Sequence, residues 1–223
     1  MTTSAPRKKR MPRAEREQQM LTIAEEVFVE QGFVASSMDD IAARVGVSKP
    51  MIYEYFGSKE GLLVACIRRA KAELFDCVAN AAAGITDPEM ALRSGFTAFF
   101  RYADEHRLSW QLVLNNEGAL AGSAAAEAIE EIRTEQTTLD RALLETFVPH
   151  VPGQTLDAIA EIIVGACERL SRWYVRTEGV TAEDAAEYVM RLAWYGLRPL
   201  VASSDENVEP VQGSHPAQEN NGA

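Results

Sequence analysis

The sequence predicts an all-α protein, and three observations carry this prediction. Apolar residues recur at helical spacing along most of the 223 residues. Serine, threonine or aspartate precedes several of these segments, and glycine or proline follows them, as is typical of helix starts and ends. No segment shows the alternation of apolar and polar residues that indicates a half-buried strand.

Three short helices are expected first. Each has a glycine stop, a serine caps the second and the third, and the third has Pro50 in its first turn, where proline is tolerated. The short Gly46-Val47-Ser48 turn predicts that the second and third helices cross steeply. In chain order, the residues that bound them are Met20 and Gly32, Ser37 and Gly46, and Ser48 and Gly57.

Longer helices are expected in the rest of the chain. Lys59 begins one that runs to about Ala83, and Asp87-Pro88 opens the next. Pro199 is expected to end the ordered part. The further helical segments are 108–113, 124–147, 155–176 and 182–197, with a loop at 115–123.

Motif searches exclude several classes of protein. The three cysteines and three histidines form no zinc or disulfide spacing, and no catalytic or nucleotide-binding signature occurs. We therefore expect no metal, no cofactor and no enzymatic activity. No 18-residue apolar run and no signal-peptide pattern occur, so a cytoplasmic protein without a membrane partner is expected.

The charge is divided unevenly along the chain. The net charge is −11, which argues against coating nucleic acid through bulk charge. However, residues 1–70 hold 11 basic and 9 acidic side chains, whereas residues 71–223 hold 11 and 24. This split indicates a basic head on an acidic body, although an ordinary acidic protein with a solvated tail has the same charges.

The stretch 37–56 carries the functional signal. Two short helices joined by a glycine turn form a helix-turn-helix pattern, whose second helix can enter a DNA major groove. Side chains on its outer face offer contacts to phosphates, to guanine and to thymine methyl groups, and the starts of two helices favour an anion. The predicted DNA-binding residues are Ser37, Ser48, Lys49, Pro50, Met51, Tyr53, Tyr55 and Lys59, with the basic arm Arg7, Lys8, Lys9 and Arg10.

Two alternatives stay open for these residues. Tyr53 and Tyr55 can equally be core or surface aromatics of a small three-helix unit. The basic arm can be solubilising, or it can reach the minor groove and flanking phosphates.

The same stretch resembles the DNA-binding head of TetR-family transcriptional regulators. The resemblance covers about residues 14–66 and implies three head helices followed by six longer ones that bind a ligand and dimerise. Ser36-Ser37 stand where the family often has threonines, and Pro50 replaces a common small residue. The matching residues are Gly32-Phe33, Ser36-Ser37, Asp40-Ile41-Ala42, Gly46-Val47-Ser48, Ile52-Tyr53, Tyr55-Phe56, Ser58-Lys59-Glu60 and Leu62-Leu63.

The last two helical segments have apolar faces wide enough to bury on two sides. One side would meet the chain's own core and the other a second copy, so a homodimer with a four-helix interface is expected, as the resemblance also implies. A monomer with a thick core is the alternative. The predicted interface residues are Leu170, Tyr174, Tyr188, Leu192 and Tyr195.

Large apolar residues on successive body helices predict a cavity for a small apolar or amphipathic effector. Each of them is also an ordinary core residue. Inward-pointing arginines would favour an anionic amphiphile, and Arg133, Gln136 and Asn116 are further polar candidates. The predicted ligand-binding residues are Phe96, Phe99, Phe100, Trp110, Asn115, Ile132, Leu139, Arg169 and Trp173.

Together these expectations describe a dimeric repressor that binds a palindromic double-stranded operator and is released by its effector. A DNA-binding dimer without a ligand, or a small helical enzyme, are the alternatives. The expected domains are a basic arm (1–13), a DNA-binding head (14–58), a ligand-binding and dimerisation body (59–201) and a disordered tail (202–223).

Overall fold

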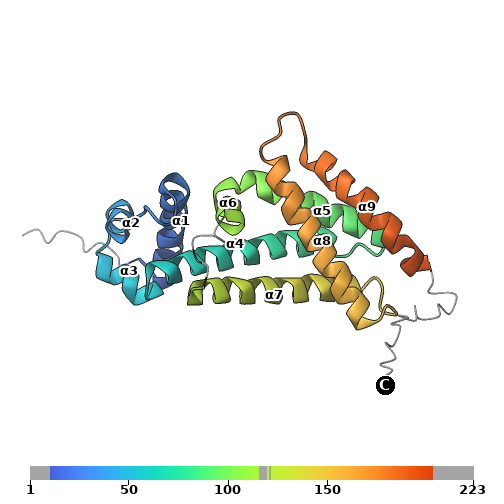
Figure 1. Cartoon of the computed structure of the whole chain (residues 1–223), viewed down its shortest axis with the longest axis horizontal. Helices are drawn as coiled ribbons and strands as arrows, with labels where there is room; N and C mark the ends of the chain where they lie inside the picture. Colours follow the sequence, from blue (N-terminus) through green and yellow to red (C-terminus); the bar gives the residue numbers. More distant parts are fainter. Residues whose placement is uncertain (1–10, 116–119, 121, 203–223) are drawn as a thin grey trace, which may run out of the picture.

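The computed structural model describes residues 11–115, 120 and 122–202 and folds them into helices without strands. The first three described helices form a head at one end, and six others form the body (Figure 1). None of the described helices is long and apolar enough to cross a bilayer. The helices are α1 (Arg13–Gln31), α2 (Met38–Val45), α3 (Lys49–Phe56), α4 (Lys59–Ala82), α5 (Pro88–Glu105), α6 (Arg107–Asn115), α7 (Ala124–Glu145), α8 (Gly153–Tyr174) and α9 (Ala182–Ala202).

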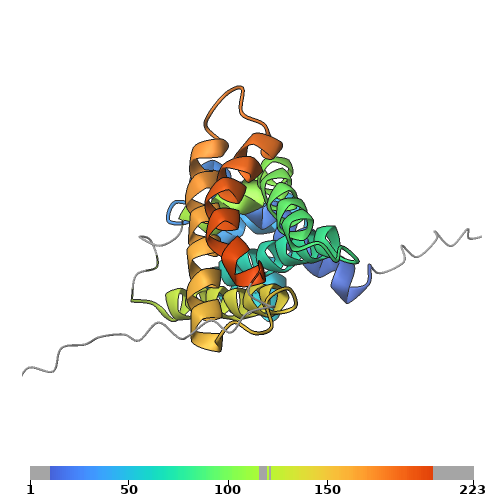
Figure 2. The same ribbon diagram turned by 90° about the vertical axis from the view of Figure 1, so that its right-hand side faces the viewer.

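Helix α4 connects the head to the body. Its first turn packs against α3, and farther along it packs against α1, α5, α6 and α7 (Figure 1). At the far end of the molecule α8 and α9 lie side by side, with α5 behind α9 (Figures 1 and 2). The two functional regions predicted from the sequence therefore share one long helix.

The head is built on caps that the sequence predicts. The Ser37 hydroxyl accepts a hydrogen bond from the Asp40 N–H at 3.0 Å, which starts α2. Gly46 ends α2 with φ 76° and ψ 35°, a left-handed conformation that glycine adopts without steric cost. This turn sets α3 across α2, with Ile41 and Ile52 fully buried between the head helices.

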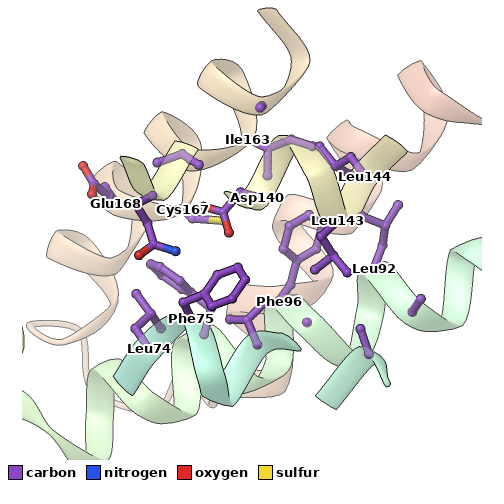
Figure 3. Close-up of a pocket in the computed structure, with 18 of the residues that line it drawn as sticks. Leu74, Phe75, Leu92, Phe96, Asp140, Leu143, Leu144, Ile163, Cys167 and Glu168 are labelled. Carbon is purple, nitrogen blue, oxygen red and sulfur yellow. The ribbon is translucent and has the colours of Figure 1, made fainter. Parts of the chain in front are cut away.

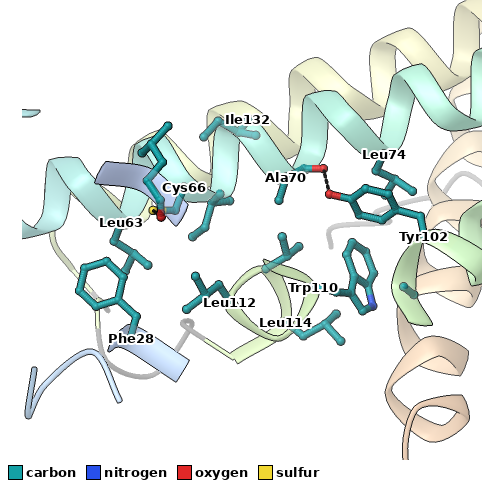
Figure 4. Close-up of a cluster of buried hydrophobic side chains, with 14 of the residues drawn as sticks. Phe28, Leu63, Cys66, Ala70, Leu74, Tyr102, Trp110, Leu112, Leu114 and Ile132 are labelled. Atoms are coloured by element: carbon teal, nitrogen blue, oxygen red, sulfur yellow. Dashed lines mark hydrogen bonds between the residues drawn. The ribbon is translucent and has the colours of Figure 1, made fainter. Parts of the chain in front are cut away.

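One hydrophobic core runs from the head into the body without a break (Figure 4). It includes Phe28 of α1, Leu63 of α4 and Trp110 of α6. Polar atoms within it are paired, since the Trp110 indole N–H donates to the Ser171 hydroxyl at 2.9 Å and the Tyr102 hydroxyl donates to the carbonyl of Ala70 at 2.9 Å. The head is thus packed onto the body, not tethered to it.

A buried polar cluster joins the same helices. The Arg69 guanidinium of α4 lies 2.5 Å from the Glu25 carboxylate of α1, and Glu25 also accepts a hydrogen bond from the Ser109 hydroxyl of α6 at 2.7 Å. The side chains of Glu25 and Arg69 are only 7% and 14% exposed. Arg69 donates further hydrogen bonds to Gln18 and Thr22. This Glu25–Arg69–Ser109 cluster ties α1, α4 and α6 together.

The all-α prediction is confirmed, and the bounds differ in two places. Helix α1 begins at Arg13 instead of near Met20, because its first turns are polar and exposed and carry no apolar period. Helix α9 continues past Pro199 to Ala202, because a proline this close to a helix end removes a single hydrogen bond and need not stop the helix. The basic arm at 1–10 and the tail at 203–223 lie outside the described residues.

Candidate nucleic-acid interface and cavity

The outer face of α3 is exposed while its inner face is buried. Ile52 is fully buried, whereas Tyr53 is 39% and Met51 36% exposed, Pro50 is exposed and Lys49 is half-buried beside them. The predicted contact residues at the start of α3 thus share one surface. An eight-residue helix that presents a mixed polar and apolar face has the size and chemistry to lie in a major groove.

Two helix starts lie beside this face. Ser37 caps α2, and Ser58 caps α4 by accepting from the Gly61 N–H at 2.9 Å. Ser48 precedes α3 with an extended backbone and makes no side-chain cap hydrogen bond. Free backbone N–H groups and the helix dipole at such starts favour a phosphate.

Lys49 and Lys59, two of the predicted DNA-binding residues, already form hydrogen bonds within the chain. The Lys49 ammonium lies 2.9 Å from the Asp39 carboxylate, a hydrogen bond that raises the pKa of Lys49. The Lys59 ammonium donates to the carbonyl of Ser36 at 2.6 Å and to that of Val34 at 3.3 Å, and it lies 4.7 Å from the centre of the Phe33 ring. Lys59 therefore holds the turn before α2 against the start of α4, with one proton left for a phosphate.

Tyr55 does not share the outer face of α3. Its ring is half-buried, 5.9 Å from the Phe56 ring, with the Arg13 guanidinium 4.9 Å from its centre. The prediction placed it outward with Tyr53. Tyr55 lies three residues after the fully buried Ile52, so it leans toward the inner side of α3, whereas Tyr53 is exposed.

The body contains a cavity between α4, α5, α7 and α8 (Figure 3). About 100 Å³ of it can be reached by the centre of a water molecule, within about 840 Å³ of atom-free space that includes its opening to solvent. Its wall is mostly apolar, which is typical of small-molecule sites. The largest apolar side chains lining it are Leu74, Phe75, Leu92, Phe96, Phe99, Leu143, Leu144, Phe147 and Ile163.

Charged groups line part of this cavity. The buried Lys71 ammonium lies 2.5 Å from the Glu168 carboxylate. Burial raises the pKa of Asp140 to about 6, although the Lys71 ammonium and a hydrogen bond from Gln136 both act to lower it. Burial also raises the pKa of the neighbouring Cys167 thiol, which is therefore protonated and unreactive at neutral pH.

The α8–α9 surface is the most apolar exposed surface in the described part of the chain. Ile162, Tyr195 and Leu192 are 70%, 73% and 81% exposed, and Tyr188 is 45% exposed. Ile162, Tyr188 and Leu192 border a groove that Trp173 and Arg169 also line. An apolar surface of this kind is typical of a protein–protein interface.

Comparison with known proteins identifies the family. The model described as "Bacterial regulatory proteins, tetR family" matches residues 21–66, which contain the helix-turn-helix. The model "Tetracyclin repressor-like, C-terminal domain" matches residues 88–196, which contain the α8–α9 surface and all of the cavity wall except the part from α4.

The chain belongs to the TetR family.

Relatives of this TetR-family chain extend over nearly its whole length. It is 32% identical to the HTH-type transcriptional activator FasR of Mycolicibacterium smegmatis, over 87% of the chain and 89% of FasR. A solved TetR-like transcriptional regulator from Rhodococcus sp. RHA1 has a TM-score of 0.65 at 35% identity, covering 85% of the chain and 99% of that protein. The HTH-type transcriptional repressor NicS of Pseudomonas putida is 31% identical over 39% of the chain and 41% of NicS. The chain is therefore a DNA-binding transcriptional regulator.

The predicted ligand-binding residues of this TetR-family regulator separate into five groups. Phe96 and Phe99 line the cavity. Phe100, Trp110 and Ile132 are buried in the continuous core and do not line it. Leu139 is exposed on α7, because its neighbour Asp140 takes the inward position. Trp173 and Arg169 lie on the α8–α9 surface, and the side chain of Asn115 lies outside the described part.

The predicted interface residues separate similarly. Tyr188, Leu192 and Tyr195 are exposed on one surface, and Leu170 is partly buried beside them. Tyr174 is instead buried, with its ring 5.7 Å from that of Phe100, because it faces α5. Tyr174 therefore belongs to the monomer's own core.

Three charged residues that line the cavity were not predicted from the sequence. Lys71, Asp140 and Glu168 stand on predicted helices, where isolated charges are normally solvated. Lys71 did carry a signal, because it shares a helical period with Leu74 and Val78 on the buried side of α4.

Proposed function

We propose that this TetR-family regulator binds a pseudo-palindromic operator as a homodimer and leaves it when an apolar or amphipathic effector enters the cavity. The exposed face of α3 supports DNA recognition, since its apolar and hydroxyl groups are not needed to hold the head together. The two heads of a C₂ dimer would enter major grooves about 34–36 Å apart.

Helix α4 supports the coupling of the two sites. It lines the cavity through Lys71, Leu74, Phe75 and Val78, and its first turn contacts the end of α3. A tilt of α4 caused by the effector would change the spacing of the two recognition helices. A coupling of about 1–3 kcal/mol lowers operator affinity about 5- to 150-fold.

The sign of regulation depends on where the operator lies relative to the promoter. We expect a repressor from the sequence, which does not itself distinguish repression from activation; FasR is named an activator and NicS a repressor. We propose repression relieved by the effector, and transcription in vitro from a promoter containing the selected operator tests it. Transcription that rises when the regulator is added would contradict repression but not operator binding.

Removing the Tyr53 hydroxyl should weaken operator binding about tenfold. A hydrogen bond to a charged phosphate contributes roughly 1.5–3 kcal/mol, and the loss should be equal on operator and random DNA because phosphates carry no sequence. The operator is first selected from genomic fragments with the full protein, and the affinity of Tyr53→Phe is then measured by fluorescence anisotropy. Thr138→Val, which removes an exposed hydroxyl of α7 outside both the head and the proposed dimer interface, is the control and should bind normally. Equal affinity of both variants would reject the assignment of Tyr53.

Leu192→Glu should produce a monomer. The side chain is 81% exposed, so the substitution removes little packing within one chain but places a charge in the proposed apolar interface. Sedimentation equilibrium should show the monomer mass, and operator affinity should fall by about 100-fold or more because one head reads only half a site. Met90→Glu changes an exposed methionine of α5 and should remain dimeric. A dimeric Leu192→Glu protein would place the interface elsewhere.

A further inference from the structure

The polar side chains of the cavity are grouped on one side. Gln136 and Asp140 of α7 and Cys167 and Glu168 of α8 lie together, with the Lys71 ammonium among them. Figure 3 shows Asp140 pointing from α7 into the cavity beside Cys167, with Glu168 farther along the same side. The remaining wall is apolar, so a ligand that fits it has one polar end and an apolar chain.

The charges on this side do not cancel. Lys71 is almost fully buried and its ammonium is paired with the Glu168 carboxylate at 2.5 Å. Asp140 accepts a hydrogen bond from the neutral Gln136 amide and has no ion-pair partner among the described residues. One carboxylate therefore remains without a counterion at the cavity wall.

Aromatic rings lie across the cavity from that carboxylate. Phe75 of α4 and Phe96 of α5 face Asp140 in Figure 3, and both line the cavity. The face of an aromatic ring attracts a cation and does not attract an anion. The rings and the Asp140 carboxylate thus both favour a positive charge in the space between them.

We propose that the cavity selects a cationic amphiphile, an alkyl chain ending in a protonated amine, with Asp140 as its counterion. This inference rests on the proposed effector site and adds the class of effector. An ammonium would pair with Asp140 and hydrogen-bond to it while its chain contacts the apolar wall. A carboxylate would meet the charge of Asp140, and the Lys71 ammonium that could offset it is already held by Glu168.

The test compares three ligands that share one chain. Octylamine, octanol and octanoate are titrated by calorimetry into the full protein at pH 7.5, below their aggregation concentrations. We expect octylamine to bind about tenfold or more tightly than octanoate, with octanol between them, since a close charge pair in a protein is worth at least a tenfold change in affinity. Equal binding, or tighter binding of octanoate, would overturn the inference.

Asp140→Asn assigns the selectivity to one residue. The amide has the same size and is cheaper to bury than a carboxylate, so the variant should fold, as a thermal unfolding curve will verify. The preference for octylamine over octanoate should fall about tenfold. Glu131→Gln, which removes an exposed carboxylate of the same helix, should retain the preference. An unchanged preference in Asp140→Asn would overturn the inference.

Lowering the pH gives an independent measurement. Asp140 should take up a proton near pH 6, while an alkylamine stays charged and octanol does not titrate, so the preference for octylamine over octanol should weaken below that value. Lys71 of α4 and Cys167 and Glu168 of α8 are the titratable groups that face Asp140. A preference that is constant from pH 7.5 to 5 would contradict a role for Asp140.

The two proposals fail in different ways. If octanol binds and lowers operator affinity but the amine is not favoured, the proposed function stands and the cationic ligand is rejected. If none of the three ligands binds, the cationic ligand is rejected as well. If octylamine binds as expected but operator affinity does not change, the ligand class stands and the proposed switch fails.

Discussion

Gly61→Ala should cost about 3 kcal/mol of stability and abolish specific operator binding. A Cβ atom at position 61 would lie 2.1 Å from the carbonyl oxygen of Phe56. This neighbour is backbone, so the clash can be relieved only by moving the end of α3 away from α4, and such overpacking is at the upper end of the usual cost. The free energy of unfolding in urea and the anisotropy of labelled operator measure the two effects.

Gly95→Ala is the control for this prediction. Position 95 is also within a helix, but a Cβ there would lie 3.5 Å from a methyl group of Val78, which is an ordinary contact. Alanine is favoured over glycine in a helix by roughly 1 kcal/mol, so this variant should be as stable as the original or more stable. If Gly61→Ala unfolds and binds the operator like Gly95→Ala, the close contact of α3 with α4 is not required.

Glu25→Ala should destabilise the protein by about 3 kcal/mol and loosen α1. It leaves the Arg69 guanidinium, which is only 14% exposed, without its close carboxylate, and it leaves the Ser109 hydroxyl without its acceptor. Removing one member of a buried pair costs roughly 3–5 kcal/mol, and the distant Glu73 at 3.9 Å can replace only part of the lost interaction. Chemical denaturation measures the loss, and hydrogen exchange should show faster exchange along α1.

Two further variants decide whether the charge pair or the packing matters. Replacing the pair with Glu25→Leu and Arg69→Met should restore most of the stability, since apolar residues of similar volume commonly substitute for buried ion pairs. Glu135→Ala breaks the exposed pair of Arg68 and Glu135 and should cost no more than about 1 kcal/mol. A cost for Glu25→Ala as small as that for Glu135→Ala would show that the cluster contributes no more than a surface pair.

Local signals made most of the fold predictable. Ser37 and Gly46 predicted the ends of α2 because a cap acts on the backbone within a few residues of itself. The same locality explains the errors in bounds. The first two turns of α1 are exposed and show no period, and Pro199 gives a stop signal that the last turn of α9 tolerates.

The site residues were predictable only where the residues of one helix show which of its faces is buried and which is exposed. The outer face of α3 follows from the burial of Ile52, so Met51 and Tyr53 could be placed. Phe96 and Trp173 are both large aromatic residues within an apolar helical period, yet Phe96 lines the cavity and Trp173 lies on the surface. The crossing of α5 and α8 decides which face of each helix packs against another helix, and the sequence does not encode that crossing locally.

The hydrogen bonds of Lys59 could not be predicted from the sequence, for a related reason. Its partners are backbone carbonyls of residues 34 and 36, and the path of that turn is not encoded by side-chain type. Likewise, Asp140 looks like a solvated charge until α4 and α8 are placed around it.

The continuous core limits how such a regulator can be recombined. A chimera that joins this head to another body at residue 58 would cut between Phe28 and the residues of α4 and α6 that cover it. A workable chimera must keep α1 to α3 together with α4 and the surface of α6 that packs against them. This surface includes Leu63 and Cys66 of α4 and Leu112 of α6. DNA specificity is therefore exchanged more safely by substituting the exposed residues of α3 than by transplanting the head.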